Sequence, residues 1–144
     1  MSTRSLTVFK ENWEFEGKKE SKKIVAMYRH SDGYPSGHGK DLAEFLKDMV
    51  IVSGISFTEN RKIANGMGCL AAQVVSNFKS GVGSIYLYPP KSKDVGEEYI
   101  YTIENQIVTN PKLDNFPIIT IYDVYDKKEL FKGTAEDLLE SGIV

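Results

Sequence analysis

The sequence predicts an α+β domain with a mostly antiparallel sheet, two main helices packed on one face and a short C-terminal helix. Strand patterns occupy both ends of the chain and two helical patterns lie between them, an order that gives few chances for parallel crossovers. The length of 144 residues is typical of one domain, and 41% hydrophobic residues are enough for one core. We therefore expect residues 1–144 to fold as a single domain.

The first part of the chain predicts a long hairpin. Residues 2–9 and 24–28 carry the β-branched and aromatic side chains that are typical of strands. Residues 10–23 between them are highly charged, and Gly17 is the expected turn. Because the segment 24–28 is strongly apolar, we expect it to lie in the interior of the sheet.

Two helices are predicted in the middle of the chain, at residues 40–50 and 60–79. In each of them apolar side chains recur at helical spacing on one face. Gly66 and Gly68 fall inside the second helix, where glycine usually permits close approach of another backbone and costs about 1 kcal/mol relative to alanine. The apolar neighbours of Cys69 predict a buried, unreactive thiol.

The second half of the sequence predicts four strands and a last helix. The strands are expected at residues 85–88, 98–104, 117–125 and 129–132. Thr134, with Asp137 three residues later, is typical of a helix N-terminus with an acidic partner in the first turn. A short helix is therefore expected at residues 135–141.

The composition argues against several classes of function. The net charge of -2 gives no general attraction to nucleic acid or to anionic membranes. Neither a signal-peptide pattern nor an apolar run of the roughly 20 residues that span a membrane is present, so we expect a cytoplasmic protein. A single cysteine excludes an intrachain disulfide. The sequence has no P-loop and no nucleophile-elbow motif, and we expect no cofactor and no metal.

The segment at residues 28–40, Y-R-H-S-D-G-Y-P-S-G-H-G-K, is the main candidate for a functional site. It holds both histidines of the chain. Gly37 and Gly39 permit positive φ, so successive backbone N–H groups can converge on one point just before a helix N-terminus, where an anion is favoured. Arg29, His38 and Lys40 add charge-assisted hydrogen bonds. We therefore predict a binding site for a small anionic, nucleotide-like ligand.

Residues outside this segment complete the predicted ligand site. Arg4, on the neighbouring strand, would join the charged groups, and Tyr28 or Tyr34 would stack on a ring of the ligand. Asn65 would line the same pocket from the second helix, although close helix packing is the alternative for that position. The predicted ligand-binding residues are Arg4, Tyr28, Arg29, Tyr34, Gly37, His38, Gly39, Lys40 and Asn65.

Two other interpretations of the segment stay open. His30, Asp32 and His38 are the candidates for acid–base catalysis in a small hydrolase or transferase, because His30 and Asp32 share a face of an extended strand. The same three residues match no zinc-binding spacing. Asp-Gly and Pro-x-Gly are equally typical of a tight structural turn, in which Arg29 and Asp32 would form an ion pair.

A third functional interpretation concerns Tyr86, Tyr88, Tyr99 and Tyr101. Each pair shares one face of its strand, and the two strands are expected to be hairpin neighbours. The resulting tyrosine surface would suit a protein-interaction or inhibitor domain, or a homo-oligomer. The alternative is an amphipathic sheet face with solvated hydroxyl groups.

Several motifs are spread along the chain. They are M-S-T-R-S-L-T, Y-R-H-S-D-G-Y-P-S-G-H-G followed by L-A-E-F-L, A-N-G-M-G-C-L-A-A-Q, I-Y-L-Y-P-P and G-E-E-Y-I-Y. Together they resemble a family of short uncharacterised proteins of bacteria, phages and large DNA viruses. The resemblance covers nearly the whole chain and implies a self-contained domain, in the host cytoplasm if viral. It brings no known activity, but its association with mobile genomes suggests host–virus conflict, including sequestration of a nucleotide signal.

Overall fold

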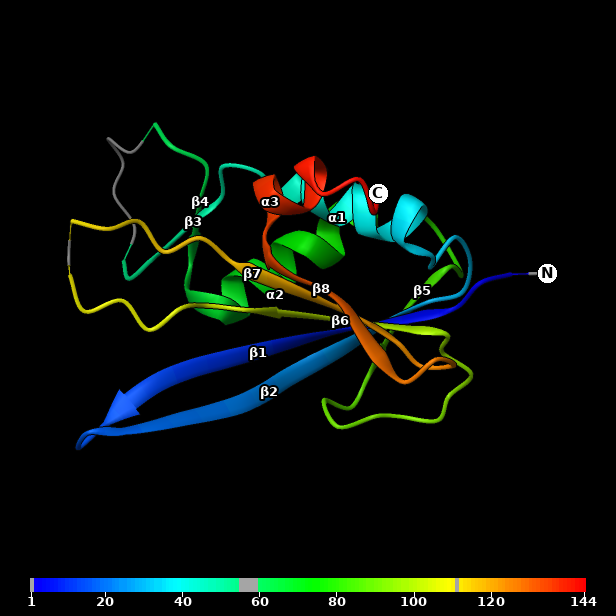
Figure 1. Ribbon diagram of the computed structural model, residues 1–144, viewed down its shortest axis with the longest axis horizontal. Helices are drawn as coiled ribbons and strands as arrows, with labels where there is room; N and C mark the ends of the chain where they lie inside the picture. Colours follow the sequence, from blue (N-terminus) through cyan, green and yellow to red (C-terminus); the bar gives the residue numbers. More distant parts are fainter. Residues whose placement is uncertain (1, 55–59, 111) are drawn as a thin grey trace.

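A six-stranded sheet forms the frame of the molecule in the computed structural model, which describes residues 2–54, 60–110 and 112–144. Its strands are β1 (Ser5–Phe15), β2 (Lys18–Arg29), β5 (Ile85–Tyr88), β6 (Tyr99–Glu104), β7 (Ile118–Asp123) and β8 (Lys128–Thr134). They lie in the order β5-β2-β1-β6-β7-β8, and only β1 and β6 are parallel neighbours (Figure 1). The predicted α+β class and mostly antiparallel sheet are therefore confirmed.

The hairpin of β1 and β2 extends beyond the rest of the sheet as an arm (Figure 1). Its turn is formed by Glu16 and Gly17, with φ of 50° and 77°, the two left-handed residues that match the twist of a tight hairpin. The predicted turn at Gly17 is thus confirmed. Near the tip, Trp13 and Phe15 are 41% and 63% exposed.

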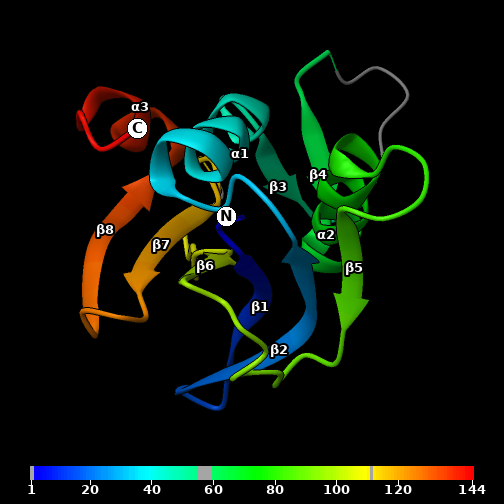
Figure 2. The same ribbon diagram turned by 90° about the vertical axis from the view of Figure 1, so that its right-hand side faces the viewer.

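Helices cover the concave side of this curved sheet (Figure 2). They are a single π-helical turn, η1 (Pro35–Gly39), and the helices α1 (Lys40–Leu46), α2 (Gly66–Phe78) and α3 (Ala135–Glu140). Helix α2 has 13 residues, whereas α1 has seven and α3 has six. The helices therefore differ from the predicted two main helices and one short one. None of the helices in the described part of the chain is long and apolar enough to cross a membrane.

The predicted helix at residues 60–79 begins later than expected, at Gly66. The residues before it form β4 (Ile63–Asn65), which pairs in parallel with β3 (Val50–Val52) in a second, two-stranded sheet. Ile63 fits the apolar spacing of the helix, but β-branched residues on both segments favour the strand pairing. Gly66, with φ of 79°, turns the chain from the strand into the helix.

The second half of the chain follows the prediction closely. Strands β5 to β8 and helix α3 begin and end within two residues of the expected positions. The predicted cap is also confirmed, because Asp137 N–H donates to Thr134 Oγ1 at 3.2 Å and Thr134 N–H donates to the Asp137 carboxylate at 3.3 Å.

The expected pairing of the two tyrosine-bearing strands is wrong. Strand β5 lies at one edge of the sheet beside β2, whereas β6 lies between β1 and β7. Tyr101 is fully buried under the helices, while Tyr86 is 48% exposed at the sheet edge. The predicted surface of four tyrosines is therefore not formed.

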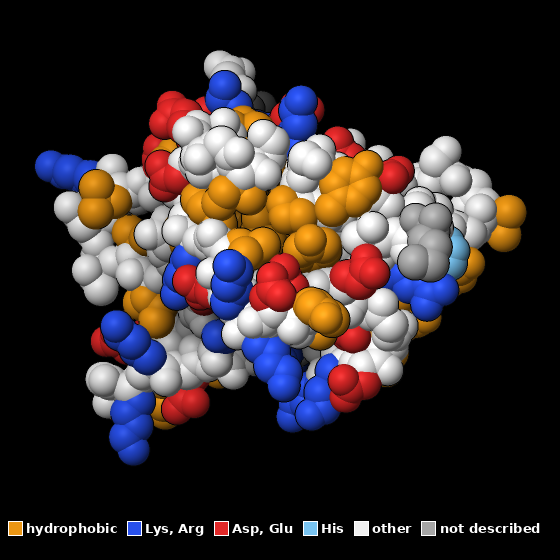
Figure 3. Space-filling view, turned by 45° about the vertical axis from the view of Figure 1, so that its right-hand side comes forward, with side chains coloured by type: hydrophobic (Ala, Val, Ile, Leu, Met, Phe, Trp, Pro, Cys, Tyr) orange, Lys and Arg blue, Asp and Glu red, His pale blue; other side chains and the backbone are white. Residues whose placement is uncertain are grey.

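The core lies on both faces of the sheet but mainly under the helices. Fully buried side chains on the helix side include Phe9, Met27, Leu42, Leu70, Ile103 and Leu138. A smaller cluster of Leu6, Val8, Ala26 and Tyr28 packs on the opposite face. Some apolar side chains stay at the surface: Figure 3 shows hydrophobic atoms gathered across the middle of one face, with charged side chains around them.

Replacement of Thr134 by alanine should destabilise the protein by about 1 kcal/mol, because the first turn of α3 would lose its side-chain acceptor. Urea denaturation of the Thr134→Ala variant measures this loss. An unchanged midpoint with an unchanged slope would contradict a stabilising role for the cap.

Candidate functional site

Residues 28–40 carry the chain from the end of β2 to α1 and are anchored to neighbouring segments. His30 N–H donates to the carbonyl of Ser84 at 2.9 Å, and Gly33 N–H donates to the carbonyl of Thr3 at 2.9 Å. Backbone hydrogen bonds therefore fix the segment independently of its side chains.

The amides at the start of α1 are used within the chain. Gly37 N–H donates to the Tyr34 carbonyl at 2.9 Å, and His38 N–H donates to the Asp32 carbonyl at 2.8 Å. Lys40 N–H donates to carbonyls of the π-helical turn. The predicted convergence of free amides on an anion is therefore wrong for these three groups.

The glycines of the segment serve close packing. A Cβ atom at Gly37 would lie 2.6 Å from the carbonyl oxygen of Asp32, and one at Gly39 would lie 3.3 Å from the Tyr101 ring. Neither glycine has the positive φ that we expected. Asp32 takes the left-handed conformation instead, with φ of 57°. Gly37 and Gly39 are thus required because of their neighbours and not because of their own backbone conformation.

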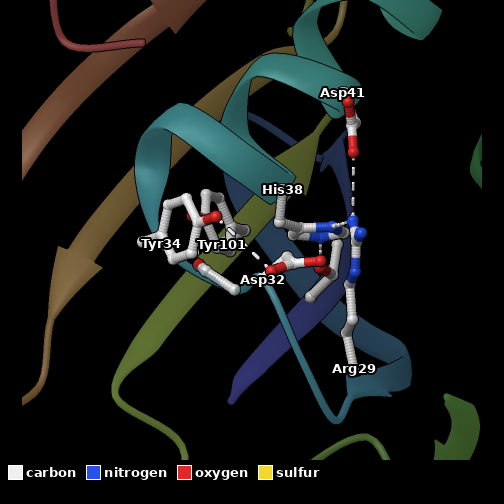
Figure 4. Close-up of polar contacts among 8 residues, drawn as sticks. Arg29, Asp32, Tyr34, His38, Asp41 and Tyr101 are labelled. Atoms are coloured by element: carbon white, nitrogen blue, oxygen red, sulfur yellow. Dashed lines mark hydrogen bonds and ion pairs between the residues drawn. The ribbon is translucent and has the colours of Figure 1, made fainter. Parts of the chain in front are cut away.

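His38 is the centre of a buried polar cluster (Figure 4). Its side chain is 0% exposed, and its ring lies 4.8 Å from the Tyr101 ring and 5.2 Å from the Phe78 ring. Nε2 lies 2.7 Å from Thr7 Oγ1, and Nδ1 lies 2.9 Å from Nη1 of Arg29. Because a guanidinium can only donate, Nδ1 must accept, and the neutral ring carries its proton on Nε2 and donates to Thr7.

The surroundings keep His38 uncharged. Burial, followed by the positive charge of Arg29, lowers the pKa of His38 from 6.5 to about 3. A general base needs a pKa near the working pH and contact with a substrate. The buried ring of His38 provides neither.

Arg29 links the cluster to α1. Its Nη1 also donates to Asp41 Oδ2 at 3.3 Å, and its guanidinium carbon lies 5.6 Å from the centre of the Phe78 ring. The side chain of Arg29 is only 15% exposed, whereas that of Asp41 is 50% exposed. Arg29 therefore forms its ion pair with Asp41. The structural-turn interpretation expected an ion pair with Asp32 and is wrong on this point.

Tyr101 closes the other side of the cluster. Its hydroxyl donates to the carbonyl of Gly33 at 2.6 Å, and burial raises its pKa. The sequence analysis missed Thr7, Asp41 and the inward orientation of Tyr101. For Thr7 a signal was present, because it is a polar residue inside a short strand whose neighbours are strongly apolar.

The other catalytic candidates lie apart from this cluster. His30 is exposed, and its ring centre lies 6.4 Å from that of Tyr28. Asp32 is exposed, and its carboxylate accepts a long hydrogen bond, of 3.4 Å, from the Tyr34 hydroxyl. Within the described ranges, no group of three or more His, Cys, Asp and Glu side chains could hold a metal ion.

Three predicted ligand residues point elsewhere. Arg4 packs its guanidinium against Gly96, and Tyr28 stacks on Tyr88 at 5.1 Å on the opposite face of the sheet. Asn65 accepts a hydrogen bond from Gly54 N–H at the start of α2. Since Phe78 ends this helix of 13 residues, Asn65 lies about 20 Å from the cluster. Lys40 is exposed at the surface.

A groove on another part of the surface is a second candidate site. It has a volume of about 620 Å³ and lies between α2 and the sheet edge. It is lined mainly by the apolar side chains Ile24, Val25, Ala71, Ala72, Val75 and Leu87. Leu87 is 58% exposed, and a Cβ atom at Gly68 would meet no atom within 4 Å. The predicted close packing at Gly68 and the predicted burial of Cys69 are therefore wrong, because this side of α2 faces solvent.

The Tyr101→Phe variant should lose about 1–3 kcal/mol of stability, because the Gly33 carbonyl would be left buried without its donor. The matched control is Tyr125→Phe, since Tyr125 is 90% exposed. Equal unfolding midpoints for the two variants would contradict a stabilising role for this hydrogen bond.

Acid should destabilise the protein through His38. The unfolded chain binds a proton on this imidazole below pH about 6.5, and the folded protein binds it only near pH 3. The free energy of unfolding should therefore fall as the pH drops through this window, by about 1.4 kcal/mol per pH unit. Urea denaturation at several pH values measures the slope.

The control for this experiment is the exposed imidazole. Stability should depend on pH similarly in the wild type and in His30→Gln, whereas the gap between the wild type and His38→Gln should narrow on acidification. NMR of the wild type gives an independent measurement, in which the His38 ring should keep its neutral chemical shifts down to pH about 4. A ring that protonates near pH 6 would contradict the buried neutral state.

Comparison with known proteins identifies no relative. No family model, no curated protein and no solved structure matches the chain. The resemblance to short proteins of bacteria, phages and large DNA viruses therefore stays a prediction from the sequence.

Proposed function

We propose that the protein is an interaction domain that binds an extended segment of a partner protein along the edge of β2, beside α2. One observation carries the proposal: an open strand edge lies next to an apolar groove. Strand addition uses this combination, because main-chain hydrogen bonds supply affinity and a groove accepts alternate side chains.

The open edge is a consequence of the shortness of β5. Strand β2 pairs with β1 along its whole length, but β5 covers only Ala26–Arg29 on the other side. After Tyr88 the chain continues with Pro89 and Pro90, and a proline has no N–H group to extend the ladder. No described strand pairs with residues 18–25 on that side, which leaves an edge of roughly 26 Å.

On the other strand of the arm, β1, a side chain bonds to the backbone at the point where the pairing with β6 ends. Where β1 leaves β6, Asn12 N–H donates to Oδ1 of Asn105 at 2.7 Å, and Nδ2 of Asn105 donates to the Asn12 carbonyl at 2.8 Å. One side chain thereby replaces a paired residue and closes the end of the ladder. The β1 edge is thus closed at Asn12, whereas no described strand pairs with residues 18–25 on the outer side of β2.

The groove suits the side chains of an added strand. Small residues recur every four positions on the outer face of α2 and leave room for ligand side chains. They are Gly68, Ala72 and Ser76. In a strand paired with β2, alternate side chains would point toward this face. Ile24 and Val25 supply the sheet side of the groove at the same end of the open edge.

The other functional interpretations have less support. An anion site in residues 28–40 requires free amides and free cations, but Gly37, His38 and Arg29 bond within the chain. Acid–base catalysis by His38 requires an accessible imidazole, and His38 is buried. An interaction surface of four tyrosines requires an exposed Tyr101, but Tyr101 is buried.

The proposal predicts binding of short extended peptides. The probes are eight-residue peptides that alternate valine with glutamate, serine or lysine, since valine favours extended backbone. At least one should shift the NMR amide signals of residues 18–25 and of the outer face of α2. N-methylation removes the N–H donor of a peptide residue. Methylation of the alternate residues whose N–H groups face β2 should abolish binding, whereas methylation of the residues between them should spare it, because only one edge of the peptide can pair with β2.

A pair of variants on α2 tests the groove. Ala72→Tyr would fill it and should weaken binding at least about tenfold. Asn77→Tyr is the control, because Asn77 is also exposed on α2 but does not line this groove. If no peptide binds, or if the amide shifts lie away from residues 18–25, the proposed function is wrong.

A further inference from the structure

We further propose that the bound segment is acidic, with carboxylate side chains alternating with apolar ones. This inference rests on the proposed function, because it concerns the same edge of β2. Its basis is the charge that the open edge presents to a neighbouring strand.

Lysines dominate the open edge. Residues 18–25 contain four lysines, Lys18, Lys19, Lys22 and Lys23, and one acidic residue, Glu20. Lys79 lies at the β5 end of the groove, where its ammonium group donates to the carbonyls of Gly83 and Ile85 at 2.9 Å each. None of these lysines forms an ion pair in the part of the chain that the structure describes.

The acidic residues on the other strand of the arm lie farther from the ligand position. Glu11 and Glu14 belong to β1, opposite Lys22 and Lys19. An added strand would lie about 4.8 Å from β2 and twice as far from β1. The larger distance is close to the Debye length of about 10 Å in 0.1 M salt, so the lysines of β2 act more strongly on the ligand.

The bulge in the arm determines which lysines face the carboxylates. Phe9 pairs with Val25 and Lys10 pairs with Lys23, so Ile24 is the extra residue of the bulge. Ile24 and Val25 both line the groove. By strand alternation, Lys23 and, four pairs further along the arm, Lys19 then lie on the opposite face.

This opposite face carries a net positive charge. On the arm it presents Lys10, Lys19 and Lys23 with one acidic residue, Glu14, and Glu104 of β6 lies beside Lys10 on the same face. Lys10 and Lys23 are directly opposite each other, an arrangement of like charges that destabilises a strand pair. A ligand that places valine-like side chains in the groove would place every second residue beside Lys19 and Lys23, where a carboxylate is favoured.

The same charges disfavour a second copy as the occupant. Two β2 edges in antiparallel contact would bring four lysines of each copy together. The lysines therefore both protect the edge from self-association and select a ligand of opposite charge.

The three alternating peptides test this inference by fluorescence polarisation. The valine–glutamate peptide should bind at least about tenfold more tightly than the valine–serine peptide in low salt, and the valine–lysine peptide should bind most weakly. The advantage of glutamate should decrease as salt is added. The double variant Lys19→Gln/Lys23→Gln should lose most of this advantage.

The matched control is Lys47→Gln/Lys128→Gln, which removes the same charge at exposed positions away from the edge. Equal binding of the three peptides at the groove would overturn the acidic ligand and leave the proposed function intact. Failure of all three to bind would overturn both. A concentration-dependent dimer that the glutamate peptide dissociates would overturn the inference in favour of a second copy, and light scattering detects it.

Discussion

The buried, uncharged imidazole of His38 is the constraint on which this end of the molecule depends. Each ring nitrogen has a partner from a different strand, Thr7 on β1 and Arg29 on β2. Arg29 in turn reaches Asp41 on α1, so one polar chain ties two strands to a helix. A buried polar group is tolerated only when its hydrogen bonds are satisfied, and removing one partner leaves the others unsatisfied. The residue types that suggested chemistry here hold the architecture together.

Local signals in the sequence predicted the fold well, and long-range pairings were missed. The hairpin turn at Gly17 and the cap at Thr134 depend on a few adjacent residues, so their positions follow from the sequence. The parallel pairing of β1 with β6 joins segments about 90 residues apart, and the sequence of neither strand indicates its partner. Ile63 fits a helical repeat, yet it pairs in a strand because of its tertiary neighbour. Whether a helical repeat or a strand pairing prevails in such a segment depends on tertiary contacts that form only in the folded chain.

The candidate site shows the same division. The sequence identified residues 28–40 as unusual, but their roles depend on Thr7 and Tyr101, which are 31 residues from His38 and 68 residues from Gly33. The firm attachment of this segment also anchors the end of β2, a strand that extends far beyond its outer neighbour β5. One end of the strand is fixed by Arg29, and the other end is supported only by β1. A surface for strand addition requires this kind of scaffold, because a partner then meets a backbone that is already extended.

The tight surroundings of the glycines bear on how this chain can diverge through evolution. At Gly33 even one methyl group would lie 2.9 Å from backbone atoms of Thr3 and Arg4, and at Gly37 the gap is smaller still. Drift in this stretch is therefore limited by volume, whatever the protein does. A block of invariant positions around His38 in an alignment would report steric intolerance, and it would be a poor guide to chemistry. Variation along the lysine-rich arm would be the more informative record of changing partners.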